Sequence, residues 1–257
     1  ATVRKAVAAS AIGNATEWFD YGIYAVSVTY ITQHFFPGEY GTILALATFA
    51  FSFLVRPLGG IFWGPMGDRL GRKHVLALTI LMMAGATFLI GVLPTHETIG
   101  ILAPILLVIL RAVQGFSSGG EYGGAATMMA EYAPRNRRGF WGSFLEFGTL
   151  AGFALGSLIV LMGELKIGNE AMMDWGWRVP FLIAGPLGIV GLYLRSKLGE
   201  SPVFEEMDEK GSDEGSTGKV FGSLFKNHWQ QILIMTGLVT AVNVVNYTLL
   251  SYMPTYL

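Results

Sequence analysis

Two carboxylates lie among aromatic residues in the first long apolar stretch of the chain. Glu17 and Asp20 are three residues apart, which places them on one face of a helix, and Trp18, Tyr21 and Tyr24 lie around them. An ionisable side chain within such a stretch is costly, so it marks a candidate functional site. Carboxylates beside aromatic rings attract an ammonium group, and two close carboxylates can also carry a proton. A structural pair that fixes this helix to a neighbour is the alternative.

A further ionisable group lies in the middle of another apolar stretch. Arg111 is followed one helical turn later by Gln114. A guanidinium offers a planar fork of donors that fits the carboxylate of a small molecule. It can equally be held by Glu17 or Asp20 of the same chain. Both arrangements stay open, and they could alternate.

Three more charged residues fall inside apolar stretches, nearer to the end where most of the positive charge lies. They are Arg56, Glu121 and Glu146. Their similar predicted depth allows mutual pairing, so we expect an inner network that forms and breaks as a cavity opens. A permanent cluster of salt bridges is the alternative.

The composition indicates where these residues work. Of 257 residues, 52% are hydrophobic and 14% are charged. A soluble protein carries about 25% charged residues, so a soluble enzyme and a disordered chain are excluded. The net charge of −1 also excludes a basic nucleic-acid binder. A polytopic membrane protein remains, with the lipid bilayer as a partner.

Apolar stretches long enough to cross a bilayer recur along the chain. A membrane helix needs roughly 20 mainly apolar residues. This criterion predicts seven spans, at residues 8–31, 42–63, 75–93, 99–130, 140–162, 178–194 and 229–257. Thirteen Lys and Arg residues lie before the first span and in alternate loops, against two on the other side, which predicts a cytoplasmic amino terminus.

No set of residues typical of catalysis or metal binding is apparent. The chain has no cysteine, and its histidines lie near span ends or in loops without metal-ligand spacing, at His34, His74, His96 and His228. We therefore expect no enzyme activity, no metal and no organic cofactor. The carboxylates are the expected proton carriers.

A polar linker separates the last predicted span from the others. Residues 195–228 contain a charged run followed by small, polar residues. We expect them to form a cytoplasmic loop between a six-span domain at 1–194 and a seventh span at 229–257. Because the sequence stops inside or at the end of a span, we expect a carboxy-terminal half of similar size as its missing partner.

The loop after the second span holds the sharpest local motif. Residues 64–73 combine glycines with Asp68, Arg69, Arg72 and Lys73 in the pattern G-x-x-x-D-R-x-G-R-K. This pattern resembles the signature loop of the major facilitator superfamily. The resemblance implies that the charges of this motif, Asp68, Arg69 and Arg72, act in closing the inner side. We also assign Glu131, just after the fourth span, to the inner network.

Further stretches resemble the metabolite:proton symporter family of that superfamily. They are residues 13–22, 56–60, 111–115, 119–122, 174–180, 185–189 and 252–257. The resemblance implies an all-α polytopic major facilitator fold of twelve spans. This chain would hold the amino-terminal six-helix bundle and span 7, with spans 1 and 4 lining the cavity. It also implies uptake of a small zwitterionic osmolyte, such as proline or glycine betaine, with a proton as the coupling ion.

Two other functions stay open. A symporter of a di- or tricarboxylate, such as 2-oxoglutarate or citrate, or of shikimate would need interior cations, which Arg56 and Arg111 could supply. A membrane sensor that transports nothing belongs to another class. Uptake into vesicles would separate the two classes.

The seventh span carries a neutral counterpart of the first carboxylate pair. The halves of these transporters are related by a parallel repeat. An offset of 226 places Asn243 over Glu17, Asn246 over Asp20 and Tyr247 over Tyr21. We expect neutral donors and acceptors to face the charged pair across the cavity, because a second desolvated charge would be costly. Two asparagines that merely bond to neighbouring helices are the alternative.

Overall fold

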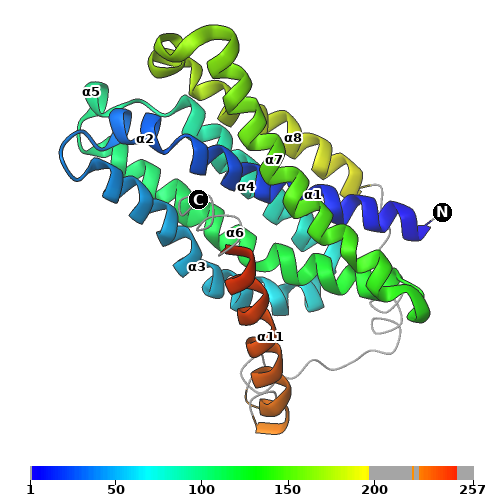
Figure 1. Cartoon of the computed structure of the whole chain (residues 1–257). Coiled ribbons are helices and arrows are strands. Elements are labelled where there is room, and N and C mark those ends of the chain that lie inside the picture. Colours follow the sequence, from blue (N-terminus) through cyan, green and yellow to red (C-terminus); the bar gives the residue numbers. More distant parts are fainter. Residues whose placement is uncertain (1, 197–221, 223–225, 248–257) are drawn as a thin grey trace. The chain divides into compact units, whose positions relative to one another are not determined.

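The computed structural model describes residues 2–196, 222 and 226–247, and every regular element in these ranges is a helix (Figure 1). The chain divides into two compact units, Ala1–Glu209 and Lys210–Leu257. The second contains α11 (Trp229–Tyr247). The first contains α1 (Thr2–Val26), α2 (Val28–Phe35), α3 (Gly41–Leu70), α4 (Arg72–Val92), α5 (His96–Ile99), α6 (Leu102–Tyr132), α7 (Arg138–Ala171) and α8 (Arg178–Ser196), with a 3-10 turn at Arg135–Arg137 and a π-turn at Met172–Gly176.

Predicted spans 2 to 6 each coincide with one long helix, although the ends differ, and the described part of span 7 is α11. The first predicted span, 8–31, is instead divided between α1 and α2, which are separated at Ser27. Four segments are long and apolar enough to cross a membrane, at Gly41–Gly67, Arg72–Val92, Leu102–Tyr132 and Arg135–Gly176. Shorter apolar helices lie at Arg178–Leu194 and Trp229–Val245. Large apolar side chains cover the outer faces of the bundle, which suits contact with lipid. Most of the predicted loop at 195–228 and the end of the chain at 248–257 lie outside the described residues, so the domain boundaries stay a prediction.

The predicted turn around residues 64–73 is almost entirely helical. Helix α3 continues to Leu70 and α4 begins at Arg72, so Gly71 alone joins them. Its φ of +91° lies in the left-handed region that only glycine adopts without strain. The segment predicted between spans 5 and 6 is also mainly helical, because α7 extends to Ala171 with a kink at Gly168, where φ is +82°. The apolar pattern marks where a helix is buried in lipid, and the helix itself continues beyond that boundary.

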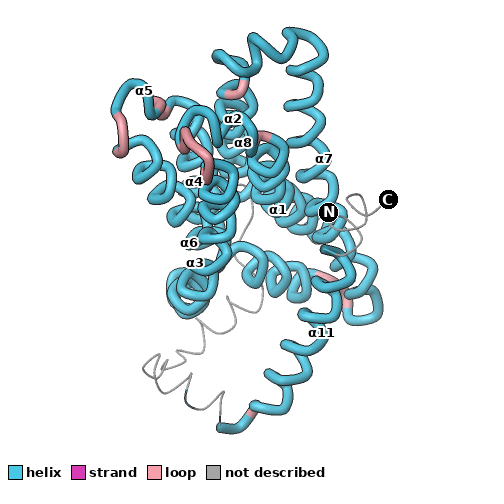
Figure 2. The backbone as a smooth tube through the Cα atoms, turned by 60° about the vertical axis from the view of Figure 1, so that its left-hand side comes forward, coloured by secondary structure: helices cyan, strands magenta, loops and turns pink. Residues whose placement is uncertain are grey.

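The helices of the first unit run side by side and pack in reciprocal pairs (Figures 1 and 2). The most extensive contacts join α1 to α7, α3 to α6, and α4 to α8. The long helices form two consecutive sets of three, α1, α3 and α4 and then α6, α7 and α8. The first helix of each set packs on the second helix of the other set, and the third helices of the two sets pack together. Two repeats related by a two-fold axis give this pattern.

Glycines recur every four residues in the fourth and fifth predicted spans, at positions 115, 119 and 123 and at positions 148, 152 and 156, and this spacing predicts close packing of helices. Most of these glycines line the two long seams of the bundle. The seams contain Gly148, Gly152 and Gly156 against α1, and Gly115 and Gly119 against α3. A Cβ atom at Gly152, for example, would overlap the carbonyl oxygen of Ala15. Gly123 is the exception to the prediction, because nothing lies within 4 Å of the position its Cβ would take.

Candidate functional site

Asp20 forms the centre of a buried polar cluster contributed by α1, α4 and α6. This residue is only 2% exposed. Arg111 Nη1 donates to Asp20 Oδ2 at 2.8 Å, and Gln114 Nε2 donates to Oδ1 at 2.8 Å. Thr87 Oγ1 lies 3.1 Å from Oδ1. The structure therefore brings together three of the sequence-predicted residues and adds Thr87, which the sequence had not indicated.

Glu17 has a different arginine as its partner. It is 1% exposed and forms an ion pair with Arg56 of α3. Arg56 Nε also donates to Ser118 Oγ at 2.7 Å, and the Tyr21 hydroxyl lies 3.4 Å from the same oxygen. The predicted carboxylate pair is thus two ion pairs, one helical turn apart, linked through Tyr21 and Ser118.

The aromatic residues around these carboxylates lie against the protein's own arginines. The Arg111 guanidinium carbon lies 4.2 Å from the ring centre of Tyr24 and 5.1 Å from that of Phe49. The Arg56 guanidinium carbon lies 5.0 Å from the ring centre of Tyr21. These distances are within the range of cation–π attraction. In this conformation the rings hold guanidinium groups where the sequence suggested an ammonium of a substrate.

Trp18 and the unused donors of Arg111 complete the cluster. The Trp18 ring meets Tyr21 edge to face, with centres 5.6 Å apart, and it is partly exposed. Arg111 has no exposed surface, and its Nε and Nη2 atoms have no hydrogen-bond partner among the described residues. A buried donor without an acceptor is costly, so these atoms can gain from an acceptor that enters the site.

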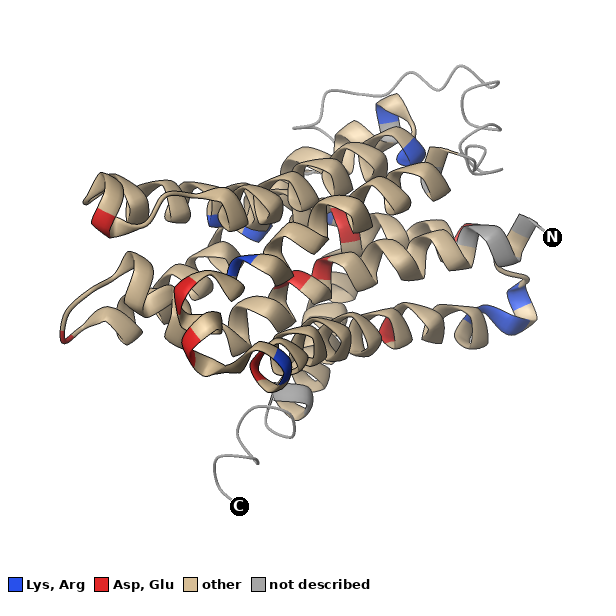
Figure 3. Ribbon diagram, turned by 90° about the horizontal axis from the view of Figure 1, so that it is seen from above, with Lys and Arg blue, Asp and Glu red and all other residues tan. Residues whose placement is uncertain are grey.

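Acidic and basic residues lie along the middle of the helices as well as at their ends (Figure 3), and those predicted for the inner network have several partners. The described contacts are the ion pair of Arg72 with Glu131, the hydrogen bond from Thr79 to Glu121 at 2.8 Å and that from Tyr122 to Glu146 at 2.8 Å. Arg56 lies with Glu17, so mutual pairing of Arg56, Glu121 and Glu146 stays a prediction. Arg69 is exposed in the last turn of α3, and the side chain of Asp68 lies outside the described residues.

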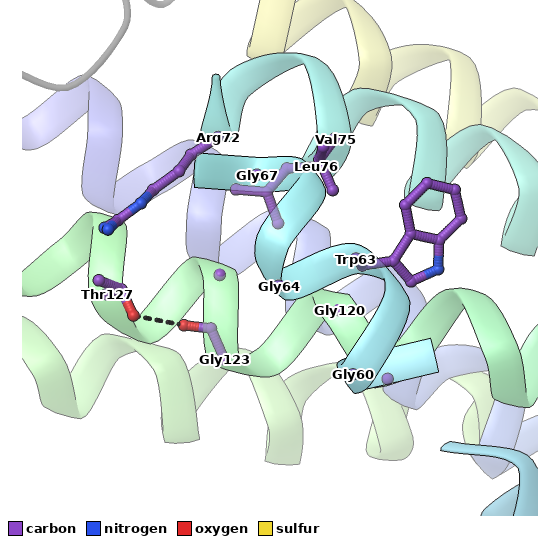
Figure 4. Close-up of a pocket in the computed structure, with 12 residues that line it drawn as sticks. Gly60, Trp63, Gly64, Gly67, Arg72, Val75, Leu76, Gly120, Gly123 and Thr127 are labelled. Carbon is purple, nitrogen blue, oxygen red and sulfur yellow. Dashed lines mark hydrogen bonds between the residues drawn. The ribbon is translucent and has the colours of Figure 1, made fainter. Parts of the chain in front are cut away.

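A cavity of about 430 Å³ opens between α3, α4 and α6, close to the motif (Figure 4). Glycines form much of its wall, with Trp63 and Arg72 at the sides, as Figure 4 shows. Gly123 and Gly64 face this space, which explains why a Cβ at either position would meet no atom within 4 Å. The prediction that Gly123 serves helix packing within this half is therefore wrong.

In the seventh predicted span, one side chain of the expected neutral set can be placed. Asn243 is exposed, and its Nδ2 donates to the carbonyl oxygen of Val239 at 2.8 Å in its own helix. Asn246 and Tyr247 lie on α11, but their side chains are outside the described part of the chain. Their expected place opposite the charged pair stays a prediction.

Several residues of the site were missed at the level of sequence because they are neutral. They are Phe49 and Phe53 of α3, Thr79 and Thr87 of α4, and Ser118 of α6. Phenylalanine in an apolar span carries no signal of its own. The two threonines are eight residues apart, which places them near one face of a helix, and this spacing could have identified them.

Comparison with known proteins decides the family. A profile for the Major Facilitator Superfamily matches residues 10–257. The chain belongs to this superfamily. The major facilitator chain is similar to the glycine betaine/proline/ectoine/pipecolic acid transporter OusA of Dickeya dadantii (strain 3937), with 48% identity over 99% of this chain and 53% of OusA. The proline/betaine transporter of Escherichia coli (strain K12) shows the same identity, 48%, over 99% of this chain and 53% of its own length.

A more distant relative and solved structures agree with this assignment. The ectoine/proline transporter ProP of Corynebacterium glutamicum is 44% identical over 99% of this chain and 53% of its own length. The chain thus spans about half the length of the curated relatives it matches. The proton:xylose symporter XylE, bound to 6-bromo-6-deoxy-D-glucose, superposes with a TM-score of 0.72 at 18% identity, covering 88% of this chain and 50% of XylE.

These findings confirm the predicted fold class. The likeness to XylE shows that the six-helix bundle has the major facilitator architecture, in a multi-pass membrane protein. The curated relatives are transporters, which agrees with the expectation that the chain is not an enzyme.

Proposed function

We propose that the full-length protein takes up a small zwitterionic osmolyte, such as proline or glycine betaine, by proton symport with alternating access. The names of the relatives support this substrate class, since OusA and the Escherichia coli protein are named as betaine and proline transporters. The proton is the coupling ion, and no other cofactor is required. The membrane is the cytoplasmic membrane, with the amino terminus inside, because most Lys and Arg lie on that side.

The observation that carries the proposal is the charge balance of the buried cluster. Glu17 with Arg56, and Asp20 with Arg111, form two pairs with no net charge. A dicarboxylate needs uncompensated cations, and both arginines are compensated in this conformation. A zwitterion carries no net charge, so the cluster can exchange one of its own pairs for a pair with the substrate. This favours an osmolyte over 2-oxoglutarate or citrate.

Protonation of Asp20 provides a way to couple proton movement to substrate binding. A proton on this carboxylate weakens its ion pair with Arg111 and releases a guanidinium that already has two unused donors. Because Arg111 is fully covered by its own unit, it can meet a substrate carboxylate only after α1, α4 and α6 shift. Protonation, helix movement and substrate binding are therefore linked at one residue pair.

Uptake by the full-length protein in proteoliposomes tests this proposal. With an imposed inward proton gradient, we expect labelled proline to accumulate, and a protonophore should abolish the accumulation. Unlabelled glycine betaine should compete, while 2-oxoglutarate, citrate and shikimate should not. Competition by the carboxylates alone would favour the dicarboxylate alternative, and the absence of any uptake would favour a sensor.

Asp68→Asn in the inner motif should slow turnover more than it weakens binding. The motif lies at the end of α3, distant in sequence from the buried cluster, and its charges can favour closure of the inner side without touching substrate. Loss of a charged hydrogen bond that forms in one state alone would slow exchange by about tenfold. Turnover and half-saturation concentration in proteoliposomes measure the two effects. Normal turnover with a large loss of affinity would contradict the gating role.

Asn243→Ala should raise the half-saturation concentration for substrate by about fivefold, the equivalent of one ordinary hydrogen bond. The pH dependence of uptake should stay unchanged, because asparagine carries no proton that titrates. Initial rates over a range of proline concentrations and pH values measure both quantities. Unchanged affinity in a normally inserted variant would remove this residue from the site.

A further inference from the structure

Thr87 of α4 holds an unusual place in the buried cluster, because its single hydroxyl proton has two acceptors. Oγ1 lies 3.1 Å from Asp20 Oδ1 and 2.9 Å from the carbonyl oxygen of Met83, one turn earlier in its own helix. Gln114 Nε2 donates to the same Oγ1 at 2.7 Å. A hydroxyl has one donor and two acceptor lone pairs, so it can donate to Asp20 or to Met83 but not to both fully.

The other groups of the cluster leave this proton as the part that can move. Gln114 is held at both ends, because its Oε1 accepts from Arg111 Nη1 at 2.7 Å while its Nε2 donates to Asp20 and Thr87. Thr87 itself is 1% exposed, so no bulk water competes for its hydroxyl. Rotation about one bond is enough to transfer its donation from one acceptor to the other.

We infer that Thr87 is a positioning residue whose hydroxyl changes its acceptor according to the protonation state of Asp20. This inference rests on the proposed proton symport. When Asp20 is ionised, the hydroxyl donates to the carboxylate and joins α4 to α1 by a charge-assisted hydrogen bond. When Asp20 is protonated, the hydroxyl donates to Met83, a bond within α4 of a kind common for threonine in helices. The proton thereby releases α4 from α1.

In the described part of the chain few charged groups lie close to Asp20, so a single hydrogen bond from the Thr87 hydroxyl has a large share in stabilising the ionised carboxylate. Arg111 on α6 is its direct ion-pair partner, and the Glu17–Arg56 pair lies one turn away. Helix α7 also packs against α1, through Gly156 at Phe19. The charged residues of α7 nearest in sequence to Gly156 are Glu146 and Glu164. Each is at least eight residues from Gly156, which corresponds to about 12 Å along the helix. The charged residues of α4 and α8 lie in their end turns, at Arg72, Lys73, His74, Arg178 and Arg195.

The same arrangement occurs a second time on α4. Thr79 Oγ1 lies 2.8 Å from Glu121 Oε2 and 3.1 Å from the carbonyl oxygen of Leu76. Two threonines of one helix thus each face a buried carboxylate and a carbonyl of their own helix. Helix α4 is therefore joined to α1 and to α6 by the same kind of bond.

The pH profile of transport by the full-length protein separates a positioning role from mere packing. Thr87→Val keeps the shape of the side chain and removes the hydroxyl, whereas Thr87→Ser keeps the hydroxyl. Loss of a hydrogen bond to the ionised carboxylate should move the pH of half-maximal proton-driven proline uptake upward by about one unit. Infrared titration of the buried protonated carboxyl band in the lipid-reconstituted protein should show the same upward shift. Thr87→Ser should retain the wild-type midpoint.

Thr48→Val is the matched control, because the Thr48 hydroxyl is also buried but donates to Leu44 of its own helix. It should leave the pH midpoint unchanged. If Thr87→Val does not insert, Thr87→Ala removes the same hydroxyl without crowding and should show the same shift. A wild-type midpoint by both methods in the variants that lack the Thr87 hydroxyl would overturn the inference. Absence of proton-driven uptake by the wild type would contradict the proposed symport instead, and the infrared titration would still decide the role of Thr87.

Discussion

Asp20→Asn is expected to abolish proton-driven accumulation while sparing exchange of internal for external substrate. The amide cannot take up a proton, so the ion pair with Arg111 is replaced by a neutral contact that no longer responds to pH. Arg111 then stays available for a substrate carboxylate in both orientations of the carrier. Binding and exchange can continue, but the proton gradient has no group in this cluster through which to act.

Two measurements on proteoliposomes containing the full-length protein test this expectation. Accumulation under an imposed proton gradient should fall to passive equilibration, whereas counterflow of labelled proline should stay near the wild-type rate. Glu97→Gln is a suitable control, because Glu97 is exposed in the short helix α5 and should not affect coupling. Wild-type accumulation by Asp20→Asn would exclude Asp20 as the coupling residue.

The sequence was sufficient to identify the charged residues of the site, but not their pairing. Glu17, Asp20 and Arg111 are recognisable because ionised groups are rare within apolar spans. Their partners depend on how the helices pack. Reciprocal packing of α1, α3 and α6 places Arg56 beside Glu17 and Arg111 beside Asp20, whereas the sequence had left both Glu17 and Asp20 open as partners of Arg111.

The positions of the helix ends were the other limit of sequence reasoning. Hydropathy reports where a helix enters lipid, and α3 continues beyond that point to Leu70, through a motif that had been expected to be a turn. The glycine spacing in α7 predicted close packing against another helix, because close approach of two backbones requires small residues over several turns, and the structure shows that this helix is α1. The same spacing failed at Gly123, since spacing alone cannot distinguish a packed face from the wall of a cavity.

Breaking the ion pair of Glu17 and Arg56 from one side is expected to have a large effect on stability. Glu17 is 1% exposed, so removal of its cation leaves a charge that water cannot solvate. Breaking a buried pair from one side typically costs about 3–5 kcal/mol, whereas removal of both charges is far less costly. We therefore expect Arg56→Gln to lower the thermal unfolding temperature of the purified full-length protein strongly, and Glu17→Gln to lower it less, because Arg56 can reach solvent and still donate to Ser118.

The double variant Glu17→Gln/Arg56→Gln decides whether this energy comes from the pair itself. Two neutral amides can hydrogen-bond to each other in the same place, so the double variant should unfold at a higher temperature than Arg56→Gln alone. Its substrate accumulation should nevertheless fall below the wild-type level, because one of the two buried titratable carboxylates of α1 is lost. Additive effects of the two single substitutions on unfolding would show that Glu17 and Arg56 are not energetically coupled. Recovery of stability without recovery of accumulation would assign the pair to both folding and transport.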